Sequence, residues 1–96
     1  MNDQDAIRRP QPPPLPGEGD VWAEVIDEYS DRAELVALFT DRRQFGIDKY
    51  GTPLQMGNGR DPIEDLRDEI LDGIAYAHQA GRFDIWGNLV RLMLLL

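Results

Sequence analysis

The sequence contains no cysteine and only one histidine, His78. Disulfides and thiolate metal sites are therefore excluded, and a single histidine cannot form a multi-histidine zinc site. Candidate metal ligands have to be sought among the carboxylates, which are plentiful.

Long hydrophobic runs are also absent. The C-terminal run from Leu89 to Leu96 is too short to span a bilayer and is interrupted by Arg91. The acidic N-terminal residues from Met1 to Asp5 lack the apolar core of a signal peptide. We expect a cytoplasmic protein with no membrane partner.

Basic residues are scarce, with 10 Lys and Arg against 18 Asp and Glu, which gives a formal net charge of −8. This excess argues against binding to nucleic acid, whose phosphates it would repel. It suits a protein that collects cations or one that imitates DNA. The 42% apolar and 29% charged residues of this 96-residue chain are typical of one soluble domain.

Residues 1–19 differ from the rest of the chain and form a Pro-rich N-terminal arm, while residues 20–96 form the helical domain. The segment from Gln11 to Pro16 favours polyproline II, and Gly17 and Gly19 favour a flexible hinge. The arm is interpreted as a disordered tail, or as a segment that lies over a neighbouring subunit.

Three helices are predicted, and the fold class is all-α. Asp20 is a candidate N-cap for a helix that the apolar spacing extends from residue 21 over about 25 residues. From Gly46 to Gly59, the glycines predict a long loop. A second helix follows Asp61 and ends before Gly81.

The start of the second helix carries the clearest signal, with Asp61 as N-cap, Pro62 at the first helical position and Glu64 at the capping-box position. A third helix is expected from about residue 84 to the end, and it is apolar on most sides. Such a helix has to pack against the other two and against another subunit, so a homo-oligomer is expected.

Two lines of carboxylates occur at helical spacing. Asp27, Asp31 and Glu34 follow the i, i+4, i+7 pattern in the first helix. The second helix repeats the pattern with Asp65, Glu69 and Asp72, and Tyr76 comes next on this line. On antiparallel neighbouring helices, the two lines would bind divalent cations such as magnesium between them. The alternative is two solvated acidic faces.

Basic side chains cluster between these helices, and they are Arg42, Arg43, Lys49 and Arg60. Cations beside a carboxylate site suit a polyphosphate substrate, which metals alone do not orient. The alternative is that they pair with nearby acids.

The loop and the second helix together resemble a known family. The pattern is Arg-x-x-x-Gly-x-x-Lys-Tyr-Gly-x-Pro-Leu, then Asn-Gly-Arg-Asp, then Asp-Leu-x-x-Glu-x-x-Asp-x-x-x-Tyr. The matching residues are Arg42, Gly46, Lys49, Tyr50, Gly51, Pro53, Leu54, Asn58, Gly59, Arg60, Asp61, Asp65, Leu66, Glu69, Asp72 and Tyr76. Over residues 21–80 the chain resembles small phage-encoded MazG-like proteins of the all-α nucleoside triphosphate pyrophosphohydrolase superfamily.

This resemblance implies a MazG-like helical bundle completed by oligomerisation, as a dimer or a tetramer. It also implies hydrolysis of the α–β phosphoanhydride with Mg²⁺ or Mn²⁺ as cofactor, giving a nucleoside monophosphate and pyrophosphate. The family's metal motif is Glu-x-x-Glu on one helix and Glu-x-x-Asp on the next. Glu69 and Asp72 match the second half, and Asp31 and Glu34 match the first half approximately, with Asp27 and Glu28 as alternatives.

The expected roles follow from this match. Glu34, Glu69 and Asp72 are the candidate catalytic and metal-binding residues, with Asp31 as a further metal ligand. Lys49 and Arg60 are expected to contact phosphates.

Tyr76 is expected either to stack on the sugar or to pack. The similarity to family members that act on dATP and dGTP implies a purine deoxynucleoside triphosphate as substrate. Alternative functions are an acidic phage interaction protein that imitates DNA and a nucleotide-binding regulator that does not hydrolyse.

Overall fold

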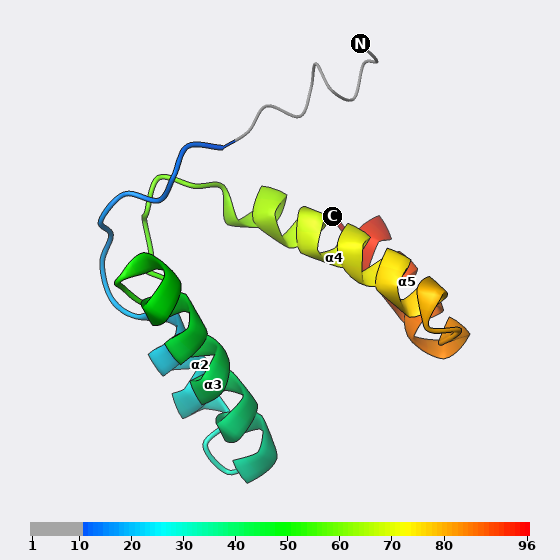
Figure 1. Ribbon diagram of the computed structural model, residues 1–96, viewed down its shortest axis with the longest axis horizontal. Helices are drawn as coiled ribbons and strands as arrows, with labels where there is room; N and C mark the ends of the chain where they lie inside the picture. Colours follow the sequence, from blue (N-terminus) through cyan, green and yellow to red (C-terminus); the bar gives the residue numbers. More distant parts are fainter. Residues whose placement is uncertain (1–10) are drawn as a thin grey trace. The chain divides into compact units, whose positions relative to one another are not determined.

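The computed structural model describes residues 11–96, and the regular elements in this range are all helices (Figure 1). They are α2 (Val21–Glu28), α3 (Ala33–Tyr50), α4 (Pro62–Gln79) and α5 (Phe83–Leu94). The predicted all-α class is confirmed for this part of the chain. The chain forms two compact units, Pro12–Gly59 with α2 and α3, and Arg60–Leu96 with α4, α5 and Gln11. None of the helices in residues 11–96 is both long and apolar enough to cross a membrane.

Asp20 links the first two helices, because it caps α2 and binds α3. Its Oδ1 atom accepts a hydrogen bond from the backbone N–H of Ala23 at 3.0 Å. Its Oδ2 atom lies 2.7 Å from Nη2 and 2.9 Å from Nε of Arg43, which belongs to α3. The Asp20 cap is therefore confirmed, and the same carboxylate stabilises the packing of α2 against α3.

The prediction of one continuous helix from residue 21 to about residue 45 is wrong. The chain leaves α2 after Glu28, forms a turn over residues 29–32, and begins α3 at Ala33. This turn lets Phe39 of α3 contact two aromatic rings, with centroid distances of 5.8 Å to Trp22 and 5.9 Å to Tyr29. Tertiary packing of these aromatic side chains outweighs the local apolar periodicity, which contains no glycine or proline to mark the break.

The predicted end of this helical region at Gly46 is also wrong. Helix α3 continues through Gly46 to Tyr50 and ends at Gly51, which has a φ of 81°. This left-handed conformation suits glycine, because it has no Cβ. The backbone N–H of Gly51 donates to the carbonyl of Ile47 at 2.7 Å. Lys49 consequently lies in the last turn of α3 rather than in a loop.

Residues 15–18 of the Pro-rich arm run beside residues 55–58 of the same unit. The N–H of Leu15 donates to the carbonyl of Asn58 at 2.8 Å. Glu18 and Met56 exchange two backbone hydrogen bonds, of 2.8 and 2.9 Å. From Leu15 to Glu18, the arm is therefore hydrogen-bonded to its own chain. Residues 1–10 of the arm lie outside the described residues.

The start of α4 agrees with the sequence prediction. Asp61 is the N-cap, Pro62 opens the helix, and Oδ1 of Asp61 accepts from the N–H groups of Ile63 at 2.9 Å and Glu64 at 3.3 Å. The side chain of Glu64 instead contacts Arg67 at 3.0 Å. The helix ends at Gln79, two residues before Gly81.

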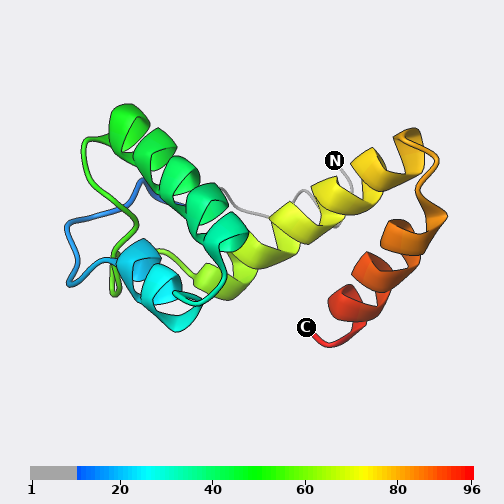
Figure 2. The same cartoon turned by 90° about the horizontal axis from the view of Figure 1, so that it is seen from below.

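Helices α4 and α5 pack together as a hairpin, which Figures 1 and 2 both show. Within residues 11–96 the buried apolar residues are Ile70 and Ala77, both on α4. A Cβ atom on Gly73 would lie 3.3 Å from Cδ1 of Leu89, so α5 packs closely against α4 at this glycine. The α5 segment also has large apolar side chains that remain exposed, including Phe83, Leu92 and Leu94.

Candidate functional site

Helix α4 carries the carboxylate line that the sequence predicts. Asp65, Glu69, Asp72 and Tyr76 all lie within Pro62–Gln79, so their spacing places them on one side of the helix. Glu69 and Asp72 are exposed, and Tyr76 has 68% of its surface accessible. From Glu69 to Tyr76 the line is therefore open to solvent in the α4–α5 unit.

The two ends of this line differ in electrostatic environment. Asp65 is paired with Arg60, and nearby Glu64 is paired with Arg67. Glu69 and Asp72 form no ion pair or hydrogen bond with another side chain in the part of the chain that the structure describes. The unneutralised negative charge of the line is therefore concentrated in its C-terminal half.

The other two predicted metal ligands lie in the α2–α3 unit. Asp31 is in the turn between α2 and α3, and Glu34 is in the first turn of α3, 3.8 Å from Arg32. The expected alignment of Asp27, Asp31 and Glu34 on one helix face is wrong, because the helix is broken at residues 29–32. Over residues 11–96, no group of three or more His, Asp or Glu side chains is arranged to hold a metal.

Each of the four basic residues contacts a different side chain. Arg43 binds Asp20 and Arg60 binds Asp65, so pairing with nearby acids, the alternative considered above, is confirmed for these two. The guanidinium carbon of Arg42 lies 4.4 Å from the centre of the Phe45 ring. Nζ of Lys49 lies 5.2 Å from the centre of the Tyr50 ring, a cation–π contact at the exposed end of α3.

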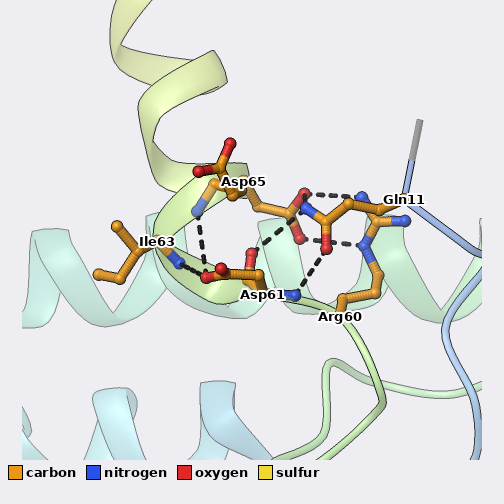
Figure 3. Close-up of polar contacts among 6 residues, drawn as sticks. Gln11, Arg60, Asp61, Ile63 and Asp65 are labelled. Atoms are coloured by element: carbon orange, nitrogen blue, oxygen red, sulfur yellow. Dashed lines mark hydrogen bonds and ion pairs between the residues drawn. The ribbon is translucent and has the colours of Figure 1, made fainter. Parts of the chain in front are cut away.

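Asp65 lies at the centre of a polar cluster at the start of α4 (Figure 3). Its Oδ1 atom lies 2.6 Å from Nη2 of Arg60, and its Oδ2 atom accepts from Nε of Arg60 at 3.0 Å. This bidentate hydrogen bonding by Arg60 lowers the pKa of the Asp65 carboxyl below its ordinary value, although partial burial opposes the shift.

Gln11 completes the cluster, and sequence reasoning missed it. Its Nε2 atom donates to Oδ1 of Asp65 at 2.9 Å, and its Oε1 atom accepts from the backbone N–H of Asp61 at 2.6 Å. Gln11 is 50 residues from Asp61 and belongs to a segment that reads as a polyproline arm. Local spacing contains no signal for such a contact.

Both tryptophans and His78 make contacts with other aromatic rings. Trp22 of α2 packs against Phe39 of α3, with the ring centroids 5.8 Å apart. The ring of His78, at the end of α4, makes edge contacts with Phe83 at 6.0 Å and Trp86 at 6.3 Å. These contacts connect the end of α4 to the start of α5.

Comparison with known proteins gives no match. No protein-family model matches the chain, and searches of curated proteins and of solved structures find no similar protein.

Proposed function

We propose that this protein is a metal-dependent pyrophosphohydrolase of nucleoside triphosphates. The observation that carries the proposal is the exposed pair Glu69 and Asp72 on α4. Within residues 11–96 these two carboxylates have no ion-pair partner, whereas the acids one turn earlier are paired with arginines. The pair also coincides with the Glu-x-x-Asp half of the metal motif in the family that the sequence resembles.

The donor set on α4 fits magnesium or manganese. Both ligands are carboxylates, and magnesium is commonly held by one or two carboxylates together with substrate phosphates. Glu69 and Asp72 would hold the ion, with Glu34 and Asp31 as proposed further ligands. The bound ion would supply neutralisation of the phosphate charge.

The proposed reaction is hydrolysis of the α–β phosphoanhydride. A carboxylate among Glu34, Glu69 and Asp72 accepts a proton from water, and the water oxygen bonds to the α-phosphorus. The bond between the α-phosphorus and the bridging oxygen breaks, and pyrophosphate leaves with its electron pair. Arg60 and Lys49 stabilise the negative charge of the phosphates, and Tyr76 contacts the sugar.

The proposed substrate is a purine deoxynucleoside triphosphate, and the proposed active form is a homo-oligomer. The substrate assignment rests on the resemblance to family members that act on dATP and dGTP. The oligomer is supported by the exposed apolar side chains of the α5 segment, such as Phe83, Leu92 and Leu94. In a subunit this small, a second copy of the chain would bury such a surface.

One observation favours a different function, that of an acidic protein that imitates DNA. Arg43 and Arg60 are paired with the chain's own carboxylates, so the basic residues are less prominent than the sequence suggests. Thermal unfolding with Mn²⁺ separates the two functions. The proposed enzyme is stabilised because the ion binds the folded state, and a DNA mimic shows no such shift.

The decisive experiment incubates the protein with each canonical dNTP and NTP in the presence of Mg²⁺ and resolves the products. We expect a monophosphate and pyrophosphate, and release of diphosphate and phosphate would contradict the proposed bond. Binding of nucleotide without any product would identify a regulator that does not hydrolyse.

Glu69→Gln tests the residue that carries the proposal. We expect kcat to fall by at least about 100-fold because a charged metal ligand and candidate base is lost, while the circular dichroism spectrum stays unchanged. Glu64→Gln is the matched control, since Glu64 lies on the same helix but is paired with Arg67. Full activity of Glu69→Gln would refute the assignment.

A further inference from the structure

The side-chain amide of Gln11 contacts the start of α4 at three points (Figure 3). Its Oε1 atom accepts from the backbone N–H of Asp61 at 2.6 Å. Its Nε2 atom donates to the backbone carbonyl of Asp61 at 3.3 Å and to Oδ1 of Asp65 at 2.9 Å. One side chain thus binds both backbone groups of the N-cap residue and the first carboxylate of the acidic line.

Gln11 makes the hydrogen bond that the side chain of Glu64 would make in a complete capping box. In a complete capping box, the acidic side chain at the third helical position accepts from the N–H of the N-cap residue. Here that side chain is Glu64, and it is bonded to Arg67 instead. The N–H of Asp61 is bonded to Gln11, which comes from a distant part of the sequence.

The contact with Asp65 links Gln11 to Arg60. Oδ1 of Asp65 accepts from both Gln11 and Arg60, and Oδ2 accepts from Nε of Arg60. A carboxylate held by a third donor has fewer orientations, and the planar guanidinium that it binds at two points is restricted with it. The Asp65 side chain is 39% exposed and that of Arg60 is 27% exposed, so neither is fixed by burial alone.

We propose that Gln11 is a positioning residue, which holds Asp65 and, through it, orients the Arg60 guanidinium at the N-terminal end of the carboxylate line. Its importance for substrate binding rests on the proposed function, in which Arg60 contacts phosphate. In this arrangement Asp65 orients Arg60 and is not an additional metal ligand.

Two substitutions at Gln11 separate its contacts. Gln11→Ala removes all three hydrogen bonds. Gln11→Glu keeps an oxygen that accepts from the N–H of Asp61, but it replaces the donor that faces Asp65 with a negative charge. The matched control is Gln44→Ala, which removes a glutamine–aspartate hydrogen bond of 2.8 Å to Asp48 on α3.

The first measurement does not depend on activity. The exchange of the Arg60 Hε proton with water, followed by NMR in the full-length protein, reports how tightly Arg60 is bound to Asp65. We expect exchange about fivefold faster in Gln11→Ala, the equivalent of one net hydrogen bond, and at least as fast in Gln11→Glu. The Gln44→Ala control should leave it unchanged. Unchanged exchange in both Gln11 variants overturns the positioning role.

The second measurement is steady-state hydrolysis with the triphosphate that gives the highest rate. We expect KM to rise about fivefold in Gln11→Ala and further in Gln11→Glu, with kcat changed less than twofold, because Arg60 is displaced while Glu69 and Asp72 are untouched. An unchanged KM, despite faster Hε exchange, overturns the link to substrate. If the wild-type protein hydrolyses no triphosphate, the proposed function fails, and Hε exchange alone decides whether Gln11 positions Arg60.

Discussion

Substitution of Asp20 tests how the α2–α3 unit is held together. The Asp20 carboxylate has two separable contacts, a cap bond to the N–H of Ala23 and an ion pair with Arg43. Asparagine caps a helix about as well as aspartate does, whereas alanine does not. Asp20→Asn therefore removes the charge and keeps the cap, and Asp20→Ala removes both.

The expected magnitudes follow from the exposure of the pair. The Asp20 side chain is 23% exposed and that of Arg43 is 35% exposed, so solvent screens their attraction only in part. We expect Asp20→Asn to reduce the free energy of unfolding by about 1 kcal/mol at pH 7. Loss of the cap adds about 1 kcal/mol, so Asp20→Ala should lose about 2 kcal/mol.

The pH dependence provides a sharper test of the ion pair. The hydrogen bond from Arg43, assisted by that from Ala23, lowers the pKa of Asp20 below its usual 3.8, although burial opposes the shift. A lowered pKa in the folded state means that the stabilisation is fully present above pH 3.8 and is lost as the pH falls through the folded-state pKa. The difference between wild type and Asp20→Asn should therefore shrink toward zero as the pH falls through the folded-state pKa of Asp20.

The assay is urea unfolding followed by fluorescence of Trp22, in a Trp86→Phe background so that the signal comes from the α2–α3 unit alone. A loss of 1 kcal/mol corresponds to a decrease of about 0.5–1 M in the urea midpoint. Asp41→Asn is the control, because Asp41 is an exposed carboxylate on α3. A midpoint difference for Asp20→Asn that stays constant over a pH series from 7 to well below 3.8 would refute the ion-pair reasoning.

Four further substitutions, at three positions, test the packing and the acidic line. Gly73→Ala should be neutral or slightly stabilising in thermal melts, because the gain of about 1 kcal/mol in helix propensity exceeds the cost of moving the flexible end of Leu89. Gly73→Val should lose about 1–3 kcal/mol by overpacking against α5, and wild-type stability would contradict that contact. Phe39→Ala should lose about 2 kcal/mol and shift Trp22 emission to longer wavelength, and an unshifted spectrum would refute the stacking. Glu69→Gln should raise the melting temperature slightly without metal and abolish the Mn²⁺ shift, whereas a retained shift would place the ion elsewhere.

The parts of the fold that follow local rules are predictable from the sequence. The start of α4 is set by Asp61 and Pro62, and both the cap and the first helical residue are where the sequence places them. Helix α5 begins at Phe83, one residue before the expected position. These boundaries depend on hydrogen bonds and backbone angles within a few residues, so one sequence is sufficient to locate them.

The break between α2 and α3 depends on contacts that the local sequence does not contain. Tyr29 ends α2 in a region of uninterrupted apolar periodicity, and the turn is stabilised by packing of Phe39 against both Trp22 and Tyr29. The same limitation applies to Gln11, whose partners lie 50 or more residues away. Long-range packing and long-range hydrogen bonds therefore account for the errors in the predicted site as well as in the fold.

The charges along the acidic line of α4 indicate which of its carboxylates would bind a metal ion. Like charges spaced by three or four residues destabilise a helix by a few tenths of a kcal/mol per pair. At Asp65 this cost is offset by Arg60 and Gln11, but Glu69 and Asp72 have no compensating cation within residues 11–96. A divalent cation is the ligand that would reverse this penalty, which is why the proposed metal site is assigned to this pair and not to Asp65.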